Sequence, residues 1–485
     1  MTNTQRANQY SHSAKFGVIW SLVSRFGTLF ITFMSNLILV RLLMPHDYGT
    51  VGLLMVFVAI ANTLLDGGLG AALIQKAEPS EDDYSTVFTF NIVFSVILYS
   101  ILFFTAPFIA EFYKIELLSS ILRVQGLVLL INAGRIIQYN LLIKRLQFKK
   151  LAIVDVSSAT IGALCGILLA KWGFGVWSLV FNNLIYSAVF TLIINMTGKW
   201  RPKILFKYSN FRNLFSFGSM LMLSNILDTL YKNIQNVVIG KIFNTTTLGY
   251  YTQAKKMEEV PVQGLSSAVN SVFFPIFSNL QVDKNRLSEA LCRSINVISY
   301  ALFAIMTLVI LIAEPLINVV YTTKWSDSVP LFQLLCVAGM TIPINMLNLN
   351  IVKSLGKGRL FFKLQILQLA IGLASMLIGA NWGVVGLICG YIVVSFLFMI
   401  FLITVSSSLL NTSPLSQMLY IAKHLAIAML SGVLVWSVSN IITLTNIGTI
   451  LTLSLLYMSI YLSLSLVFKV SGLKECLKII FKKRA

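Results

Sequence analysis

An acidic and a basic side chain lie one helical turn apart in the middle of an apolar stretch. Asp228 and Lys232 belong to the segment SNILDTLYKNIQNVVIG, at a spacing that lets helical neighbours pair. Pairing lowers the cost of placing each charge in hydrocarbon, which is at least about 2.5 kcal/mol per side chain. Two interpretations are open: an inert internal ion pair, or a water-filled cavity that both charges line together with Asn225. In such a cavity the ammonium binds an anion and the carboxylate takes up a proton or a cation.

Other charged side chains lie deep in apolar segments, where they must face protein or water. Arg25 is about ten residues into its segment, which is roughly 15 Å at the helical rise. Asp66, in LLDGGLGAALIQ, can pair with Arg25 or Arg135, or it can bind a coupling ion. Arg123 and Arg135 bracket one segment, and Arg123 can simply reach the membrane surface. For Arg25 and Arg135, a structural ion pair and a cavity-facing role both remain open.

Segment 250–280 is the most polar of the long segments. It contains Lys255, Glu258 and Gln263, together with a helix-breaking proline at Pro261. Its apolar residues roughly follow helical spacing, so we expect one face to pack and the other to meet water. Alternatively, its first part is an extracellular extension or a broken helix.

These residues define the predicted site. The predicted anion contacts are Arg25, Arg123, Arg135, Lys232 and Lys255. The predicted coupling carboxylates are Asp66, Asp228 and Glu258. The other predicted cavity residues are Asn36, Asn225, Asn236 and Gln263. A cation-rich cavity suits a phosphate or diphosphate, which arginine binds through forked hydrogen bonds. Asp155 and Arg293 lie at the expected starts of two segments and are interpreted as ordinary helix-end charges.

The composition indicates that membrane-spanning helices position these residues. The 485-residue chain is 57% hydrophobic and 11% charged, with a mean hydropathy of +0.83, so we predict an all-α integral membrane protein. Fourteen spans are predicted, at 16–40, 50–75, 87–110, 118–143, 153–171, 175–197, 214–240, 250–280, 290–313, 329–352, 360–380, 383–406, 418–440 and 447–468. The first is expected to be retained and not cleaved as a signal peptide.

The formal net charge of +20 reflects orientation and not nucleic-acid binding. Lysine and arginine concentrate in alternate loops, around 144–150, 199–212 and 353–363, and in the tail after 468. The opposite loops hold only Arg41, Lys114, Lys171, Lys241 and Lys324. By the positive-inside rule, both termini are predicted to be cytoplasmic.

Several chemistries are not expected from this sequence. Its five cysteines have no CxxC spacing, its three histidines are scattered, and it lacks the GxxxxGK[ST] phosphate-binding motif. We therefore predict no metal site, and no cofactor other than H⁺ or Na⁺ as a coupling ion. The predicted loops are too short for a catalytic domain, so we predict no enzyme.

The chain contains two similar halves. A shift of 200 residues places Asn36 on Asn236, Arg41 on Lys241 and Gly49 on Gly249. Shifts of 208 to 210 residues align three further stretches: APFIAEFY with EPLINVVY, LIKRL with IVKSL, and WGFGVWSL with WGVVGLIC. We predict two six-helix lobes related by a pseudo-two-fold axis along the membrane normal, with two additional helices. The predicted parts are a cytoplasmic segment 1–15, an N-lobe 16–198, a basic linker 199–213, a C-lobe 214–406, two helices within 407–468 and a basic amphipathic cytoplasmic tail 469–485.

The chain resembles the bacterial polysaccharide-unit flippases in three features. These are the two lobes, the stretch LVRLLMPHDYGTVGLL after the first span, and the stretch LLDGGLGAALIQ at the end of the second. These flippases belong to the multidrug/oligosaccharidyl-lipid/polysaccharide (MOP) superfamily, and the chain is most similar to its colanic-acid and teichuronic-acid exporter branch. The resemblance covers roughly residues 10–410. It implies a multi-pass protein of the bacterial inner membrane that flips an undecaprenyl-diphosphate-linked oligosaccharide, with an ion gradient driving the cycle. Arg25 occupies a position like those of the family's cavity arginines.

The resemblance also implies partners and alternatives. The implied partners are the lipid-linked glycan, membrane lipids, and a polysaccharide polymerase with its export machinery, without nucleic acid. The alternative on the same fold is a multidrug antiporter for organic cations, against which the basic deep residues argue. A membrane glycosyltransferase or ligase would require larger loops.

Overall fold

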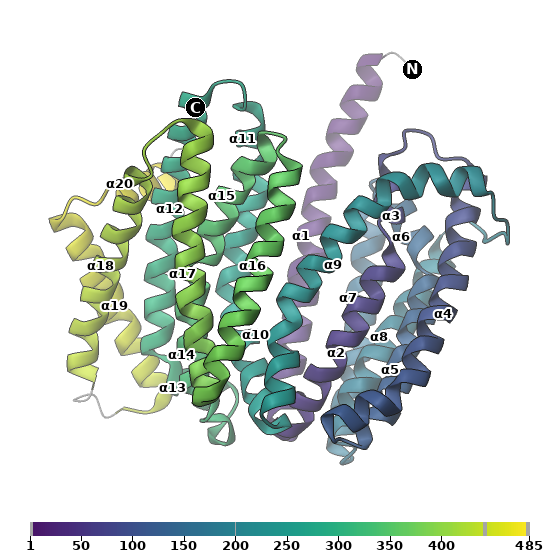
Figure 1. Ribbon diagram of the computed structural model, residues 1–485, viewed down its shortest axis with the longest axis horizontal. Helices are drawn as coiled ribbons and strands as arrows, with labels where there is room; N and C mark the ends of the chain where they lie inside the picture. The colour runs from purple at the N-terminus through teal and green to yellow at the C-terminus, as the bar shows by residue number, and fades with distance from the viewer. Residues whose placement is uncertain (1–2, 199, 440–443, 482–485) are drawn as a thin grey trace. The chain divides into compact units, whose positions relative to one another are not determined.

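The computed structural model describes residues 3–198, 200–439 and 444–481, and within these ranges the regular structure is entirely helical. The chain divides into two compact units, an N-terminal unit, Met1–Gly249, and a C-terminal unit, Tyr250–Ala485. Within each unit the long helices run side by side (Figure 1). The all-helical membrane class predicted from composition is confirmed.

The N-terminal unit is built from nine helices among its described residues and the start of a tenth. Their bounds are α1 Asn3–Leu42, α2 Pro45–Asp66, α3 Leu69–Gln75, α4 Glu81–Tyr113, α5 Leu117–Ala133, α6 Ile136–Lys144, α7 Phe148–Lys171, α8 Val176–Thr197 and α9 Tyr208–Ile242, followed by the first turns of α10. Local chemistry fixes several ends. Ser80 caps α4 by accepting a hydrogen bond from the Asp83 amide, and the buried Asp83 carboxylate pairs with Lys76 at 2.6 Å.

The C-terminal unit holds most of α10 and all the later helices. Their bounds are α10 Thr245–Ala268, a π-helical turn Val269–Phe273, α11 Phe274–Asn279, α12 Lys284–Leu311, α13 Ala313–Val320, α14 Ser328–Gly339, α15 Ile342–Ser354, α16 Gly358–Gly379, α17 Gly383–Leu410, α18 Leu415–Ser439, α19 Asn446–Val467 and α20 Ser471–Phe481. The short helix α20 packs on α12, where Arg293 pairs with Glu475 at 2.6 Å.

The predicted count of fourteen spans is not confirmed. Among the described residues, eleven helices are long and apolar enough to cross a membrane, or twelve if α5 and α6, bent by 44°, form one span. The difference arises in two places. Helix α9 is not among them because its amide, hydroxyl and charged side chains lower its mean hydropathy. Helices α16 and α17 pack against each other, yet they form one continuous apolar run of 53 residues, Gly358–Leu410.

The backbone carries the internal repeat that the sequence predicted. Three pairs of residues at offsets of 208 or 210 have positive φ angles: Lys114 and Thr322, Leu146 and Gly356, and Gly173 and Gly383. L-residues rarely adopt this conformation, so its recurrence at matching positions identifies equivalent turns. Gly49 and Gly249 behave alike, because an added Cβ at Gly49 would meet the Thr245 carbonyl and one at Gly249 would meet the Pro45 carbonyl.

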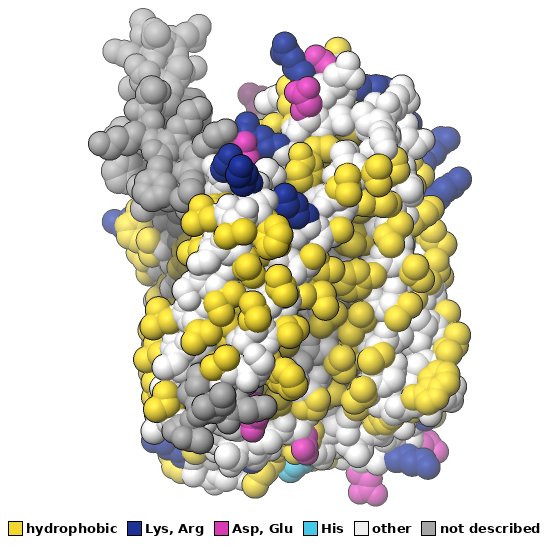
Figure 2. Space-filling model, turned by 90° about the vertical axis from the view of Figure 1, so that its left-hand side faces the viewer, with side chains coloured by type: hydrophobic (Ala, Val, Ile, Leu, Met, Phe, Trp, Pro, Cys, Tyr) yellow, Lys and Arg dark blue, Asp and Glu magenta, His cyan; other side chains and the backbone are white. Residues whose placement is uncertain are grey.

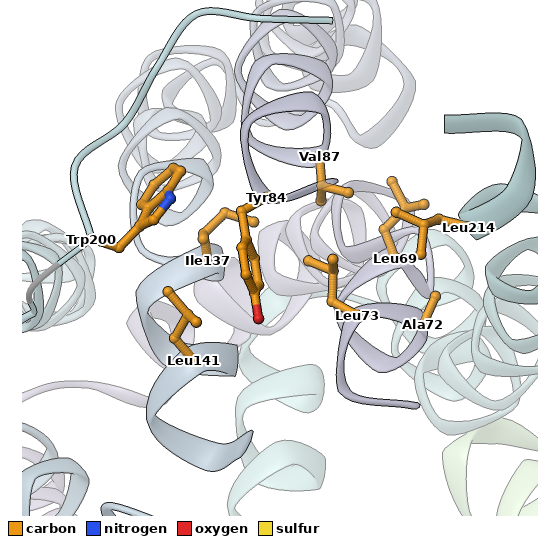
Figure 3. Close-up of a cluster of buried hydrophobic side chains, with 9 residues drawn as sticks. All are labelled: Leu69, Ala72, Leu73, Tyr84, Val87, Ile137, Leu141, Trp200 and Leu214. Carbon is orange, nitrogen blue, oxygen red and sulfur yellow. The ribbon is translucent and has the colours of Figure 1, made fainter. Parts of the chain in front are cut away.

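Apolar packing holds the N-terminal unit together where α3, α4 and α6 converge. Leu73, Val87 and Ile137 are buried there, and Tyr84 lies edge-on to Trp200 at 6.5 Å between ring centroids (Figure 3). On the outside, hydrophobic side chains cover a broad band on the face of the C-terminal helices, and lysine and arginine gather at its ends (Figure 2). A band of this kind suits contact with lipid.

Candidate functional site

The first candidate site lies at the bend between α5 and α6 and is called the Arg135 cluster: Arg135, Tyr139, Asp155, Tyr186 and Phe190. The Arg135 guanidinium lies 4.5 Å from the centre of the Phe190 ring of α8. Electrostatic interactions link it to Asp155, Tyr139 and Tyr186. The cluster thus joins α6, α7 and α8 around one cation. The α5–α6 bend places Arg135 at a helix break and away from a regular helical surface.

Arg135 has unused hydrogen-bonding capacity. Its Nη1 atom is buried and has no hydrogen-bond partner among the described residues. A buried donor without a partner costs about 1–3 kcal/mol and attracts an acceptor oxygen. Because the aromatic face of Phe190 holds the guanidinium plane, Arg135 can present its fork to a phosphate or carboxylate group.

Asp155 connects three helices at this cluster, and the sequence analysis did not include it among the candidate site residues. Its carboxylate accepts hydrogen bonds from the Ser24 hydroxyl at 2.9 Å and the Tyr186 hydroxyl at 3.1 Å, so it connects α1, α7 and α8. The interpretation as a helix-end charge was wrong because α7 begins at Phe148, five residues before the predicted start at 153. Asp155 is therefore two turns inside the helix. Nothing local in the sequence marked Tyr186 as its partner, because the same segment also holds Asn182, Asn183 and Ser187.

Arg25 and Asp66 lie in the same unit as this cluster. Arg25 follows Ser24 on α1 and its side chain is exposed. Asp66 ends α2 immediately before Gly67, is exposed, and has an electrostatic interaction with Tyr139. The ion pairs between described side chains do not join Asp66 to Arg25 or Arg135, although both pairings were considered from the sequence.

The Asp228–Lys232 pair forms as its spacing predicts. Lys232 Nζ lies 2.6 Å from the Asp228 carboxylate, and the side chains are 67% and 50% exposed on α9. The same helix contacts α2 through the Thr229 and Thr63 hydroxyls, 3.0 Å apart. The charged face of α9 is therefore turned away from the packing of its own unit. Its role as a cavity wall stays a prediction.

The second candidate site is Glu258 in the C-terminal unit. Its side chain is 4% exposed and lies against Gly339 at the end of α14, where an added Cβ would meet its Oε1 atom. Lys255, one turn earlier, interacts electrostatically with Glu258, and its Nζ is 3.4 Å from the Tyr251 hydroxyl. Glu258 makes no ion pair within 4.0 Å among the described side chains. A buried carboxylate of this kind can hold a proton or a cation.

The remaining predicted residues are not brought together with either site. Arg123 donates from Nε to the Phe103 carbonyl at 3.3 Å and lies over that residue's ring, so it ties α5 to α4. Gln263 is exposed and donates to Glu259 at 3.4 Å. Among the other polar residues, Asn225 is exposed, whereas Asn36 and Asn236 are half-buried. No group of three metal-binding side chains occurs in the described part of the chain.

Solved structures share the fold of this chain. The lipid II flippase MurJ, in an inward closed conformation, matches with a TM-score of 0.77 and 14% identity, over 93% of this chain and 98% of MurJ. An inward-facing multidrug-resistance MATE family transporter of the MOP superfamily matches with a TM-score of 0.58 and 18% identity, over 81% of this chain and 99% of its own. At these identities the likeness shows the fold alone: a multi-span helical membrane protein with the fold that these transporters share.

The chain belongs to the family of polysaccharide biosynthesis proteins, whose sequence model matches residues 38–330. The succinoglycan biosynthesis transport protein ExoT of Rhizobium meliloti is 27% identical over 71% of this chain and 69% of its own. The lipopolysaccharide biosynthesis protein WzxC of Escherichia coli is 23% identical over 78% of this chain and 77% of its own. The resemblance predicted from the sequence is confirmed.

Proposed function

We propose that this chain flips an undecaprenyl-diphosphate-linked oligosaccharide from the cytoplasmic to the outer leaflet by alternating access. The observation that carries the proposal is Arg135, a guanidinium with a buried, unpartnered donor at a helix break. That arrangement suits a diphosphate or an acidic sugar. Membership of the polysaccharide biosynthesis family and a relative named for succinoglycan transport support a glycan as the cargo.

We also propose the membrane in which the protein lies and its orientation there. The basic loops favour a bacterial inner-membrane protein with both termini in the cytoplasm. The glycan headgroup crosses through protein while most of the prenyl tail stays in lipid. We infer that a polysaccharide polymerase and export machinery take up the product.

The proposed energy source is an H⁺ or Na⁺ gradient, with Glu258, Asp66 and Asp228 as its candidate binding groups. Of these, Glu258 has the strongest support because it is the most buried. The cargo leaves chemically unchanged in this scheme, so the chain is proposed to be a transporter and not an enzyme. Purified protein that lengthened a lipid-linked glycan would contradict this.

One experiment separates function from folding. Export of the polysaccharide is measured in a deletion strain that carries wild-type or Arg135→Ala protein, with membrane levels compared by immunoblot. The proposal expects export to be lost in the variant at unchanged protein level. Normal export by Arg135→Ala would contradict it.

A multidrug antiporter remains the second candidate, favoured by the buried carboxylate of Glu258, which suits an organic cation. The shared fold with the MATE transporter permits it. Drug-resistance assays on the deletion strain distinguish the two, because only an antiporter predicts sensitivity to organic cations with intact polysaccharide.

A further inference from the structure

An apolar groove lies within the N-terminal unit between α2, α4 and α9. Its volume is about 570 Å³, and its walls include Phe57 and Ile60 of α2, Phe108 and Phe112 of α4, and Ile234 of α9. Thr105, also in the wall, donates its hydroxyl proton to the Ile101 carbonyl of its own helix at 2.7 Å. The groove therefore offers a ligand almost nothing but hydrocarbon contact.

The groove requires an apolar occupant. Phe108 and Phe112 are 71% and 53% exposed in the chain alone, and both belong to membrane-spanning α4. Water is disfavoured there because a buried water needs two to four polar partners. A volume of 570 Å³ holds about nineteen groups the size of a water molecule, at about 30 Å³ each. That corresponds to the first part of one hydrocarbon chain.

A cation marks one end of the groove. The Lys241 ammonium, at the end of α9, donates to the Phe112 carbonyl at 2.6 Å and lies 3.5 Å from the centre of the Phe112 ring. The ion pairs between described side chains do not include Lys241, so its charge is available to an anion. In the proposed orientation this end faces the outer leaflet.

An apolar groove that ends at an uncompensated cation is complementary to a lipid with an anionic headgroup. We propose that the groove holds the headgroup-proximal part of the polyisoprenyl chain of the flipped substrate, with its diphosphate at Lys241. This inference rests on the proposed function, which supplies a diphosphate lipid at the outer leaflet. The groove would then keep the product beside the protein after its headgroup has crossed.

Site-specific photo-cross-linking tests the occupant. The photoreactive residue p-benzoylphenylalanine is introduced at the position of Phe108 in full-length protein in vesicles that contain a radiolabelled polyisoprenyl-diphosphate oligosaccharide. Leu164 of α7, 56% exposed, is the matched control position. We expect labelling to be at least tenfold stronger at position 108 than at position 164. We also expect the labelling at 108 to persist when phosphatidylglycerol is present in excess. Equal labelling at both positions, or displacement by phosphatidylglycerol, would overturn the proposal.

The headgroup contact has its own test. Lys241→Met is expected to raise the lipid concentration for half-maximal labelling by about tenfold, the effect of one lost charge-assisted contact. Lys171→Met, a basic residue at the end of α7, should leave it unchanged. Labelling unaffected by Lys241→Met would remove the diphosphate from the proposal. If the wild-type protein labels at 108 but flips no lipid, the groove stands and the proposed function fails.

Discussion

The two units carry opposite charges at equivalent helix breaks. In the N-terminal unit the break between α5 and α6 presents Arg135, stacked on Phe190. In the C-terminal unit the break between α14 and α15 follows Gly339, against which the Glu258 carboxylate packs. The helix breaks are equivalent, but the charges beside them come from different elements: Arg135 lies at the break itself, whereas Glu258 reaches it from α10. We infer a division of labour, with the anionic cargo bound in one unit and the coupling ion in the other.

The largest expected effect is at Arg135. Arg135→Ala removes the forked donor, and losing two charge-assisted hydrogen bonds of about 1.5 kcal/mol each lowers transport by about 100-fold. Arg135→Lys keeps the charge without the fork and should lie between wild type and Ala. Export per unit of membrane protein is the measurement. Arg123→Ala is the matched control, and an equal loss there would remove the special status of Arg135.

The second effect is at Glu258. Glu258→Gln keeps the shape but removes the titratable, negatively charged group, so gradient-driven transport should fall by about tenfold and lose its dependence on the gradient. Glu259→Gln, half-buried on the same helix, is the control. Transport into vesicles is measured with and without pH and Na⁺ gradients. A Glu258→Gln variant that still responds to both gradients would end the division of labour.

A smaller effect is expected at Asp155, which interacts electrostatically with Arg135 and which we expect to position it without meeting the cargo. Asp155→Asn keeps one acceptor oxygen where the carboxylate uses two, one for the Ser24 hydroxyl and one for the Tyr186 hydroxyl, and it loses the negative charge near Arg135. We expect the half-saturating substrate concentration to rise by about three- to tenfold, at little cost in maximal rate. Tyr186→Phe should shift it in the same direction. A fall in maximal rate alone would indicate a different role.

The smallest effect is expected on stability at the exposed Asp228–Lys232 pair. Exchanging the two residues keeps the pair, so the unfolding free energy should change by less than about 1 kcal/mol. If the pair lines the transport cavity, export should nevertheless fall, because the positions of both charges are reversed. Thermal unfolding in detergent and export are measured together. Wild-type export by the exchanged variant would identify an inert ion pair.

Much of the fold was predictable because it depends on local or periodic information. Apolar length and composition predict a helical membrane protein, and the 200- to 210-residue offsets predict the repeat that reappears in the positive φ angles of Lys114 and Thr322. The count of fourteen spans is not confirmed, because α9 is a long helix that is too polar to be counted among the apolar spans. A hydropathy scale detects helices whose side chains face lipid. Helix α9 packs against α2, α3 and α4, so part of its surface faces protein and can be polar.

The candidate site was predictable only in part. The sequence singled out Arg135 as a charge in an apolar segment, and Glu258 as one of several charges in the unusually polar segment 250–280. It missed the link from Ser24 to Asp155 and Tyr186 because these residues lie on three helices more than 30 residues apart. Such contacts follow from helix packing, which no local pattern records. The Gly339 contact of Glu258 is of the same kind.

The most direct test of the central claim is lipid flipping by purified protein in vesicles. A fluorescent undecaprenyl-diphosphate oligosaccharide is compared with the same glycan on an uncharged lipid, using wild-type and Arg135→Ala protein. We predict that wild-type protein flips the diphosphate lipid much faster than the uncharged one, and that Arg135→Ala abolishes this difference. Equal rates for the two lipids with wild-type protein would contradict the assignment of Arg135 as the diphosphate contact.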